Sequence, residues 1–599
     1  MASFPAWTWN IPEYFNIGVA CTDVHADSPL GDRAAVIVDD DTRGVRQTTF
    51  AELAAQTSRC GEVLRTLGVV PGDRVLIRLA NCLEYPIVFL GAMKCGAIPV
   101  PTSILLTAQE ALYLARDSGA RVLVTDRLSW NAMRAALRAL EDLQYILLTD
   151  GDDASAVAPL APGLPDDAPD SAPSPAHHFD AGEGWREGAS IGRNTPGPSP
   201  SPLPHGKDAR ERTPGGPSVL HLAAALAAVT SWRAPHPTRA DDPAYLVYTS
   251  GTTGYPKGVL HAHRALLGRQ PSSTYWFDFR PAGDRVLHSG KFNWTYVLGT
   301  GLMDPLFRGH TAIVHEGSAD ADLWVPLIAK HQATIFIGVP TLYRHIIQRT
   351  AYGHVDVPTL RHCMSAGEQL SGEVLARWHE RFGLEIYEGL GMTECSYYLC
   401  ETKARPIRPG SAGFAQPGHD VKLLDPMTWT EVSHGIEGML CIPRNDPALL
   451  LRYWNQPEET ALCFRGEWFL TGDYARQDED GYLWFLGRKD DLINSFGYRV
   501  SPHEVERVLK EHPDIADAAA VGETAEPDKV LVVAYVIPRP GSALSADDVL
   551  RYGGQHLASY KAPKIVYLVD EFPRTRNGKL QRRALTPARA ATRSMSHQE

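Results

Sequence analysis

The sequence predicts an α/β fold with a large N-terminal α/β domain and a smaller C-terminal α+β domain. Strand-like apolar segments alternate with helical patterns from about residue 35 to 150 and again from Leu220 to about 487. This alternation is typical of a parallel sheet that is covered by helices. One amphipathic helix and three strands follow, which favours a second, smaller domain. We therefore predict an N-terminal domain at residues 1–487 and a C-terminal domain at 488–599.

The individual elements are predicted from hydrophobic periodicity and β-branched content. In chain order, we expect a helix at Phe50–Leu67, a strand at Val75–Leu79, a helix at Tyr85–Gly96, a strand at Val122–Thr125, a strand at Ala244–Tyr248, a helix at Val505–Leu509, and strands at Ala518–Val521, Val530–Val536 and Ile565–Val569. Residues 152–216 interrupt this pattern, because they are rich in Pro, Gly, Ser and Asp and cannot bury much apolar surface. We predict a disordered surface insertion there. Composition alone also fits an interdomain linker.

Composition excludes several classes of protein. The chain has 599 residues and a formal net charge of −12, which argues against a nucleic-acid-binding protein with a basic face. It contains no apolar run of 18 residues or more and no basic N-terminal leader, so we expect neither a membrane span nor a signal peptide. The nine cysteines are scattered without a CxxC pair, which favours a reduced, cytoplasmic location without a zinc site.

A loop rich in Gly, Ser and Thr follows the strand predicted at Ala244–Tyr248. It spans Thr249–Gly258, and the next segment, Val259–Leu267, is predicted to begin a helix. A small-residue loop between a strand and a helix lets backbone N–H groups surround a phosphate. The glycine spacing differs from that of a Walker A loop. An ordinary flexible loop remains the alternative.

Two further segments carry side chains suited to a nucleotide and a metal. Tyr387–Glu394 ends in Thr393, whose hydroxyl can donate to a phosphate, and Glu394, whose carboxylate suits Mg²⁺. Taken alone, this pair is also typical of a helix cap. Asp473, in Thr471–Asp473, can accept hydrogen bonds from ribose hydroxyls, although a turn aspartate is the simpler interpretation.

The last two segments are basic. Gly487–Arg499 lies at the predicted domain boundary, and Pro573–Leu580 contains Lys579 after a glycine. By themselves, such segments are usually solvated surface.

In this order, the five segments resemble the signatures of the adenylate-forming superfamily, which includes acyl-CoA synthetases, adenylation domains of peptide synthetases and luciferases. Within this superfamily, the segments most resemble those of the benzoate-CoA and medium-chain acyl-CoA ligases. Because related chains run through residues 152–216 within one domain, the resemblance favours an insertion over a linker. It implies that a carboxylic acid reacts with ATP to form an acyl-adenylate and then with CoA to form a thioester. It also implies Mg²⁺ as a cofactor.

The resemblance also implies roles for individual residues. Catalysis is assigned to Lys257, Thr393, Glu394 and Lys579, with Glu394 binding the metal. Nucleotide and CoA binding is assigned to Thr249, Ser250, Gly251, Thr252, Thr253, Gly254, Gly367, Glu368, Gln369, Glu388, Gly389, Asp473, Arg488, Gly497 and Arg499. Asp490 is the expected hinge, and Phe292, Trp294 and Gly391 are expected in the acyl pocket. Gly391 is expected to leave room for acids larger than acetate, while the aromatic residues are equally consistent with core packing.

Three other functions stay open from the sequence. The chain could load a carrier protein in trans, act as a luciferase-like oxygenase, or be a catalytically inactive nucleotide-binding protein. Pro573 and Gly578-Lys579 also fit the Pro-x4-Gly-Lys pattern recognised by lysine acetyltransferases in related synthetases. Such an enzyme is therefore an expected partner, and acetylation would remove the charge of Lys579.

Overall fold

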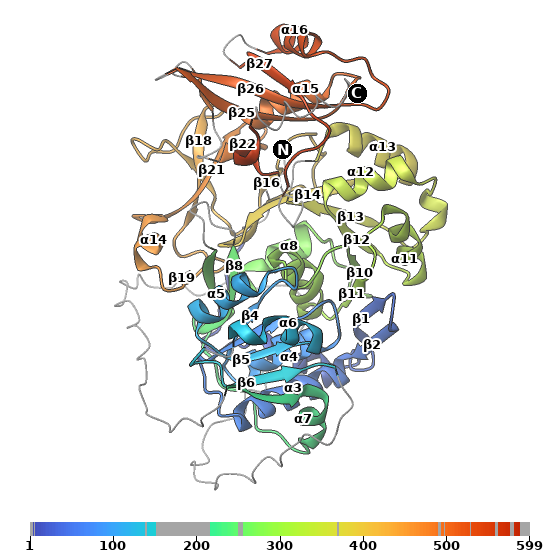
Figure 1. Cartoon of the computed structure of the whole chain (residues 1–599), viewed down its shortest axis with the longest axis vertical. Helices are drawn as coiled ribbons and strands as arrows, with labels where there is room; N and C mark the ends of the chain where they lie inside the picture. The colour runs from blue at the N-terminus through green and yellow to red at the C-terminus, as the bar shows by residue number, and fades with distance from the viewer. Residues whose placement is uncertain are drawn as a thin grey trace.

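The structure is a computed structural model that describes residues 4, 6–137, 140–150, 216–249, 256–367, 370–488, 493–495, 498–526, 529–557, 561–574 and 580–586. The predicted insertion lies outside these ranges except for its last residue. A large α/β body carries the small C-terminal α+β region at one end, which is drawn in red at the top of Figure 1. Within the described ranges, every helix is too short or too polar to cross a bilayer.

The largest sheet has nine strands. Their order across the sheet is β16 (Phe414–Ala415), β15 (Ser396–Cys400), β14 (Ile386–Met392), β13 (His362–Ala366), β12 (Ile335–Gly338), β10 (Arg285–His288), β11 (Thr311–Glu316), β1 (Ala34–Asp40) and β2 (Gly44–Thr49). The strands from β14 to β1 are parallel, and the strands at both edges are antiparallel. One face packs on α11 (Trp324–Lys330), α12 (Pro340–Arg349) and α13 (Gly372–Phe382).

The second sheet is entirely parallel, as the alternating pattern predicted. Its order is β4 (Ile98–Pro101), β3 (Arg74–Arg78), β5 (Ala120–Thr125), β6 (Tyr145–Leu148) and β7 (Ser218–His221). Val75 and Ile77 join the core beside α3 (Phe50–Thr66) and α4 (Glu84–Lys94), whereas Leu76 faces α5 (Ala108–Ser118) and α6 (Arg127–Leu137). Since both faces are covered, the strand is apolar throughout. The predicted strands and helices of this region are confirmed.

Two smaller sheets lie between these layers and the C-terminal region. One contains β19 (Arg452–Tyr453), β9 (Lys257–Ala262) and β8 (Pro243–Thr249). The other contains β17 (Lys422–Leu424), β18 (Glu437–Pro443), β21 (Trp468–Gln477) and β20 (Phe464–Arg465), with β22 (Leu483–Arg488) paired to β21. The remaining helices are α1 (Ile17–Ala20), α2 (Asp23–Ala26), α7 (Leu222–Ala228), α8 (Gln270–Tyr275), α9 (Thr295–Val297), α10 (Asp304–Phe307) and α14 (Pro457–Leu462).

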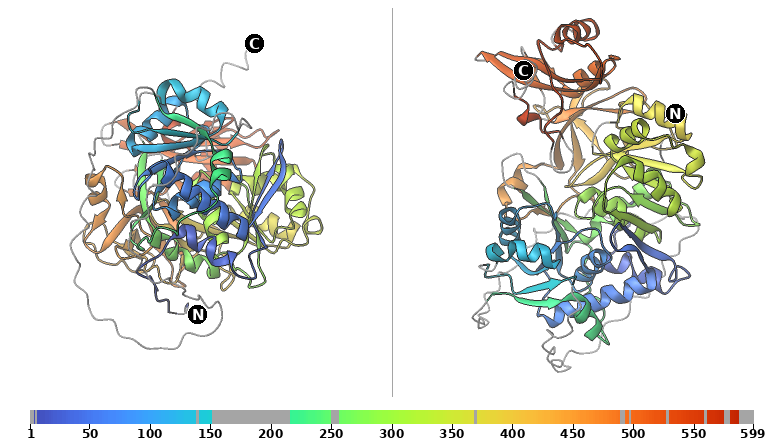
Figure 2. Two further views of the ribbon diagram at one scale, coloured as in Figure 1. Left: turned by 90° about the horizontal axis from the view of Figure 1, so that it is seen from below. Right: turned by 45° about the vertical axis from the view of Figure 1, so that its right-hand side comes forward.

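The C-terminal region has its own core. It contains β25 (Ile515–Glu526), β26 (Lys529–Pro538) and β27 (Ile565–Leu568), the hairpin β23 (Ile493–Ser495) and β24 (Tyr498–Val500), and helices α15 (Pro502–Lys510) and α16 (Ala546–His556). The predicted helix and strands are confirmed, although the domain boundary at 487/488 stays a prediction. Figure 2 shows this region at one end of the large body. Arg539 reaches Glu373 of α13 across the junction, with 3.2 Å between the charged atoms.

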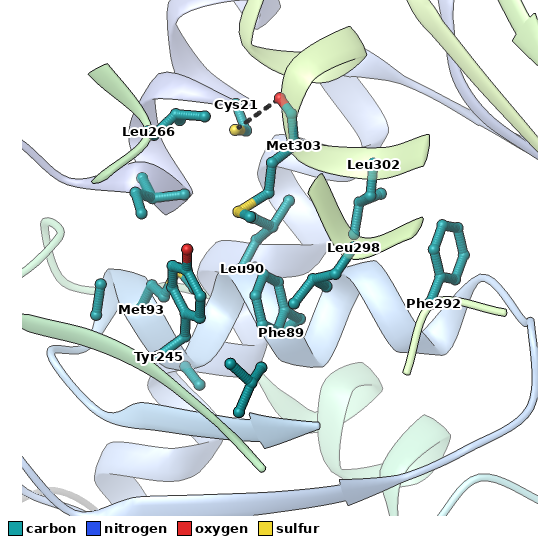
Figure 3. Packing of buried hydrophobic residues seen from close by; sticks show 14 of the residues in the cluster. Cys21, Phe89, Leu90, Met93, Tyr245, Leu266, Phe292, Leu298, Leu302 and Met303 are labelled. Atoms are coloured by element: carbon teal, nitrogen blue, oxygen red, sulfur yellow. Dashed lines mark hydrogen bonds between the residues drawn. The ribbon is translucent and has the colours of Figure 1, made fainter. Parts of the chain in front are cut away.

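The largest hydrophobic cluster joins the parallel sheet to the nine-stranded sheet. Figure 3 shows part of it, where Phe89, Leu90 and Met93 of α4 lie close to Tyr245, Leu298 and Met303. The cluster brings together segments that are separated by about two hundred residues in the sequence. This packing fixes β8, which precedes the predicted phosphate loop, to the rest of the large body.

Candidate active site

The predicted phosphate loop connects two antiparallel strands. β8 ends at Thr249 and β9 begins at Lys257, with Thr249 paired to Lys257. The helix predicted at Val259–Leu267 is therefore wrong, since Lys257–Ala262 is a strand and two short 3₁₀ turns follow, at His263–Ala265 and Leu267–Arg269. Val259 and Leu260 are buried in cross-strand pairs with Val247 and Leu246, and this packing decides the conformation of a short apolar run that fits either element. The described residues that follow the loop therefore form a strand and not the helix whose dipole was expected.

Lys257 lies at the end of this hairpin. Its Nζ donates to Oε2 of Glu459 on α14 at 2.6 Å. The same ammonium lies 5.7 Å from the ring centroid of Tyr453, which is close enough for a cation–π contact. Tyr453 is placed there because β19 pairs with β9, with Tyr453 opposite Val259.

Thr393 and Glu394 occupy the turn between the antiparallel strands β14 and β15, so the helix-cap interpretation is excluded. Two neighbours fix the backbone of this turn. Nε2 of His261 lies 2.8 Å from the carbonyl oxygen of Thr393, and the N–H of Leu450 donates to the carbonyl oxygen of Glu394 at 2.8 Å. Burial lowers the pKa of His261 to about 3. The imidazole is therefore neutral, and it donates from Nε2 because a carbonyl oxygen can only accept.

The carboxylate of Glu394 accepts a hydrogen bond from the phenol of Tyr453, with 2.8 Å between Oη and Oε1. Burial raises the pKa of Tyr453 well above its usual value, and the nearby Glu394 carboxylate raises it further. The phenol therefore stays protonated and is the donor. Tyr453 therefore contacts both Glu394, the predicted metal ligand, and Lys257, the predicted phosphate-binding lysine.

Asp473 and Arg488 are brought together by strand pairing. β21 pairs with β22 so that the two residues lie opposite each other, and Nε of Arg488 lies 3.4 Å from Oδ1 of Asp473. Tyr398 donates to the other carboxylate oxygen at 3.2 Å. Asp473 lies within a strand and is largely buried, so it is not an ordinary turn residue. Its carboxylate can accept hydrogen bonds from a ribose.

Glu388 and Gly389 lie within β14, paired with Ser365 and Ala366 of β13, and Gly367 directly follows β13. Glu388 keeps part of its surface exposed, but protein atoms crowd its carboxyl group, and this desolvation raises its pKa to about 8. The N–H of Leu370 donates to that carboxyl group at 3.2 Å. A Cβ at Gly389 would lie 2.4 Å from the ring of Trp276, so only glycine fits beside this indole. Gly367 has a φ of +95° and lies against Trp294.

The predicted acyl-pocket residues have different environments. Trp294 is partly exposed and its ring lies 5.2 Å from that of Tyr296. Phe292 is only 1% exposed and belongs to the hydrophobic core (Figure 3). Its ring packs against that of Tyr85. The prediction that Gly391 leaves open space is wrong, because a Cβ there would lie 2.2 Å from the carbonyl oxygen of Ser396. Glycine is required at this point by the irregular pairing of β14 with β15.

Several predicted residues lie outside the described part of the chain, and their roles stay predictions. They are Ser250, Gly251, Thr252, Thr253, Gly254, Glu368, Gln369, Asp490, Gly497 and Lys579. Arg499 has a described backbone in β24 but no described side chain.

Sequence reasoning missed His261, Tyr398, Tyr453 and Glu459. None belongs to a motif with recognisable spacing, and each contacts the site through strand pairing or chain crossing between distant segments. The sequence contains one weak signal for two of these residues. His261 and Tyr398 lie in short apolar runs, which favour strands that could pass near the motifs.

The donor set at Glu394 fits Mg²⁺, which favours one or two carboxylates together with phosphate oxygens. Among the described residues, a second group of potential ligands is formed by Cys395, His419 and Asp446, whose atoms lie within 4.8 Å of one another. Nδ1 of His419 donates to Asp446 at 2.6 Å, and the other carboxylate oxygen accepts from the N–H of Ala448. Both carboxylate oxygens of Asp446 are already hydrogen-bonded, and the group offers three ligands where a structural zinc site takes four. We therefore interpret it as a hydrogen-bonded cluster that holds loops together.

Comparison with known proteins identifies the family of the chain. Residues 24–454 match the family of the AMP-binding enzymes, and residues 504–579 match the AMP-binding enzyme C-terminal domain. A benzoate–CoA ligase of Thauera aromatica is 31% identical over 587 residues, covering 96% of this chain and 97% of the relative. The 3-hydroxybenzoate–CoA ligase of Aromatoleum sp. (strain CIB) is 29% identical, covering 92% and 93%.

Solved structures of CoA ligases share the fold of this chain. The anthranilate CoA ligase AuaEII in complex with anthranoyl-AMP superimposes with a TM-score of 0.78 at 26% identity, covering 98% of this chain and 99% of that one. A benzoate CoA ligase from Burkholderia xenovorans LB400 gives a TM-score of 0.74 at 28% identity, covering 95% and 99%. The predicted fold class is confirmed.

Proposed function

Because the chain belongs to the AMP-binding enzymes and is an AMP-forming acid–CoA ligase, we propose that it activates an aromatic or medium-chain carboxylic acid. ATP supplies the adenylyl group and CoA accepts the acyl group. This membership favours an active enzyme over the alternative of a catalytically inactive nucleotide-binding protein. The proposal of an aromatic acid is supported by the benzoate, 3-hydroxybenzoate and anthranilate ligases among the relatives.

The reaction follows from the weakness of a carboxylate as an acyl donor. In the first step, a carboxylate oxygen bonds to the α-phosphorus of ATP, and the bond to the bridging oxygen of pyrophosphate breaks. In the second step, the CoA sulfur bonds to the acyl carbon, the bond to the phosphate oxygen breaks, and the thiol loses its proton. AMP leaves with both electrons of that bond.

The residues of this chain contribute binding, orientation and charge. Lys257 would bind the phosphates that leave, while Asp473 would hold the ribose. Glu394 would hold Mg²⁺, which neutralises phosphate charge when bound, and the hydroxyl of Thr393 would donate to the α-phosphate. The observation that carries this assignment is the convergence of Lys257 and Glu394 on Tyr453, because a phosphate chain and its metal must lie side by side. Placing reactants in this way supplies much of the rate enhancement.

A substrate screen tests the proposal. CoA-dependent AMP formation is measured with benzoate, hydroxybenzoates, 2-aminobenzoate, hexanoate, octanoate and acetate. We expect a benzoate-like or medium-chain acid to exceed acetate by at least roughly tenfold in kcat/KM, since burying a few extra carbons supplies the roughly 1.4 kcal/mol required. A preference for acetate contradicts the substrate class. Pyrophosphate release without thioester formation indicates a carrier protein as acceptor.

A further inference from the structure

Glu459 forms an ion pair with the ammonium group of Lys257, which the proposed function assigns to phosphate binding. Its Oε2 lies 2.6 Å from Nζ of Lys257, which is a charge-assisted hydrogen bond. The lysine side chain is only 17% exposed, whereas the glutamate side chain is 41% exposed. The carboxylate therefore approaches a largely buried cation from the solvent side. A phosphate that binds Lys257 must compete with this carboxylate or share the ammonium with it.

The helix that carries Glu459 is held only lightly. α14 has six residues and none of them is buried, so no hydrophobic packing anchors it. Its principal link to the site is polar, because the hydroxyl of Thr460 accepts a hydrogen bond from the N–H of Tyr453 at 2.9 Å. Rotating one partly exposed glutamate away from the lysine disturbs no packed core. The glutamate can therefore leave the lysine without unfolding the site.

The position of Lys257 makes this contact relevant to ATP. It follows the loop that the resemblance assigns to phosphate, and it lies beside Tyr453, which holds the metal carboxylate. In the proposed reaction, the phosphates near this lysine leave as pyrophosphate. A negative side chain that can return to the lysine favours that departure, because it replaces the charge that the product removes.

We propose that Glu459 is an exchangeable counter-ion of Lys257, which the phosphates of ATP displace and which returns when pyrophosphate leaves. This inference rests on the proposed function, since it needs Lys257 to bind the leaving phosphates. It makes Glu459 a positioning residue that lowers the affinity for both ATP and pyrophosphate. AMP lacks these phosphates, and its affinity should not depend on Glu459.

The test compares Glu459→Gln with Glu458→Gln, which removes the same charge from the adjacent, exposed position of the same helix. Binding of Mg-ATP, Mg-pyrophosphate and AMP to the full chain is measured by calorimetry. For Glu459→Gln, the dissociation constants of ATP and pyrophosphate should fall by roughly two- to fivefold, the range expected for a partly exposed ion pair. AMP binding should not change, and Glu458→Gln should match the unmodified protein with all three ligands.

Unchanged or weaker binding of ATP and pyrophosphate by Glu459→Gln overturns the inference. The inference is also overturned if Glu459→Gln binds AMP more tightly to the same extent, or if Glu458→Gln changes the dissociation constants as much as Glu459→Gln does. Either result indicates a general electrostatic effect rather than exchange at Lys257. Failure of the proposed function is distinguishable, because the substrate screen detects it without any measurement of ATP or pyrophosphate affinity. None of these measurements requires the acid to be known.

Discussion

The phenol of Tyr453 donates a hydrogen bond to Glu394 across 2.8 Å and connects two chain segments 59 residues apart. If Glu394 binds Mg²⁺, this phenol keeps one carboxylate oxygen in place. Tyr453→Phe should therefore raise the Mg²⁺ concentration for half-maximal ATP–pyrophosphate exchange by roughly tenfold, because a hydrogen bond to a charged group contributes about 1.5–3 kcal/mol. Tyr398→Phe removes a phenol from Asp473 instead and should keep the Mg²⁺ requirement. An unchanged Mg²⁺ dependence in Tyr453→Phe contradicts the role.

Substituting Asp473 should weaken the binding of nucleotides but not the binding of pyrophosphate. Its carboxylate is oriented by Tyr398 and Arg488, and a ribose is common to ATP and AMP. Asp473→Asn should weaken both nucleotides by roughly tenfold, since hydrogen bonds to a charged acceptor are worth about 1.5–3 kcal/mol. Pyrophosphate binding should stay the same, and calorimetry with the three ligands measures this difference. A loss confined to ATP would place Asp473 near the phosphates instead.

Substituting Gly391 should lower the stability of the protein rather than change its choice of acid. A Cβ at this position would meet the backbone of Ser396 at 2.2 Å, and a backbone cannot move aside as a side chain can. Gly391→Ala should cost about 1–3 kcal/mol, the usual range for overpacking, and lower the thermal midpoint. Gly383→Ala is a comparison in open space, although its φ of +64° adds some strain. Normal stability of the Gly391→Ala variant, together with an altered acid preference, would restore the pocket interpretation.

The sequence predicted much of this fold because its parallel strands are buried on both faces. Val75 and Leu76 point to opposite cores, and a run that is apolar at every position has few other structures available. Val259 and Leu260 were predicted wrongly for a related reason. A short apolar run followed by polar residues fits a strand or a helix equally well, and the partner strand that decides between them is not visible locally.

The candidate site was predictable only where function imposes a motif. Glu394 and Asp473 stand out by residue type beside glycines, whereas Tyr453 and Tyr398 are single tyrosines in unremarkable surroundings. Their contacts depend on how β19 pairs with β9 and on how Tyr398 of β15 reaches Asp473 of β21. Such long-range pairing is a property of the whole fold. Phe292 lies in the core, which is the alternative that the sequence left open for the aromatic residues.

Glu388 should make stability depend on pH. Burial raises the pKa of its carboxyl group to about 8 in the folded protein, above the ordinary value of 4.5. Its contribution to stability is therefore complete below about pH 4.5 and is lost as the pH rises towards 8. Glu388→Gln should flatten the decline in thermal midpoint between pH 5 and 8, while the exposed Glu380→Gln should follow the unmodified protein. Equal declines in both variants contradict the shifted pKa.

Lys579 should serve the first half-reaction only, although its position lies outside the described residues. The resemblance places its ammonium near the α-phosphate while negative charge develops there and pyrophosphate leaves. Lys579→Ala should therefore lose acid-dependent pyrophosphate release by several orders of magnitude. In the second half-reaction the acyl-adenylate already exists and AMP is the leaving group, so the variant should convert a synthetic acyl-adenylate and CoA to thioester at a rate close to normal. Lys564→Ala, which removes an exposed lysine of the same C-terminal region, should leave both steps intact. Equal losses in the two steps would instead mean that Lys579 supports the fold or a conformation common to both.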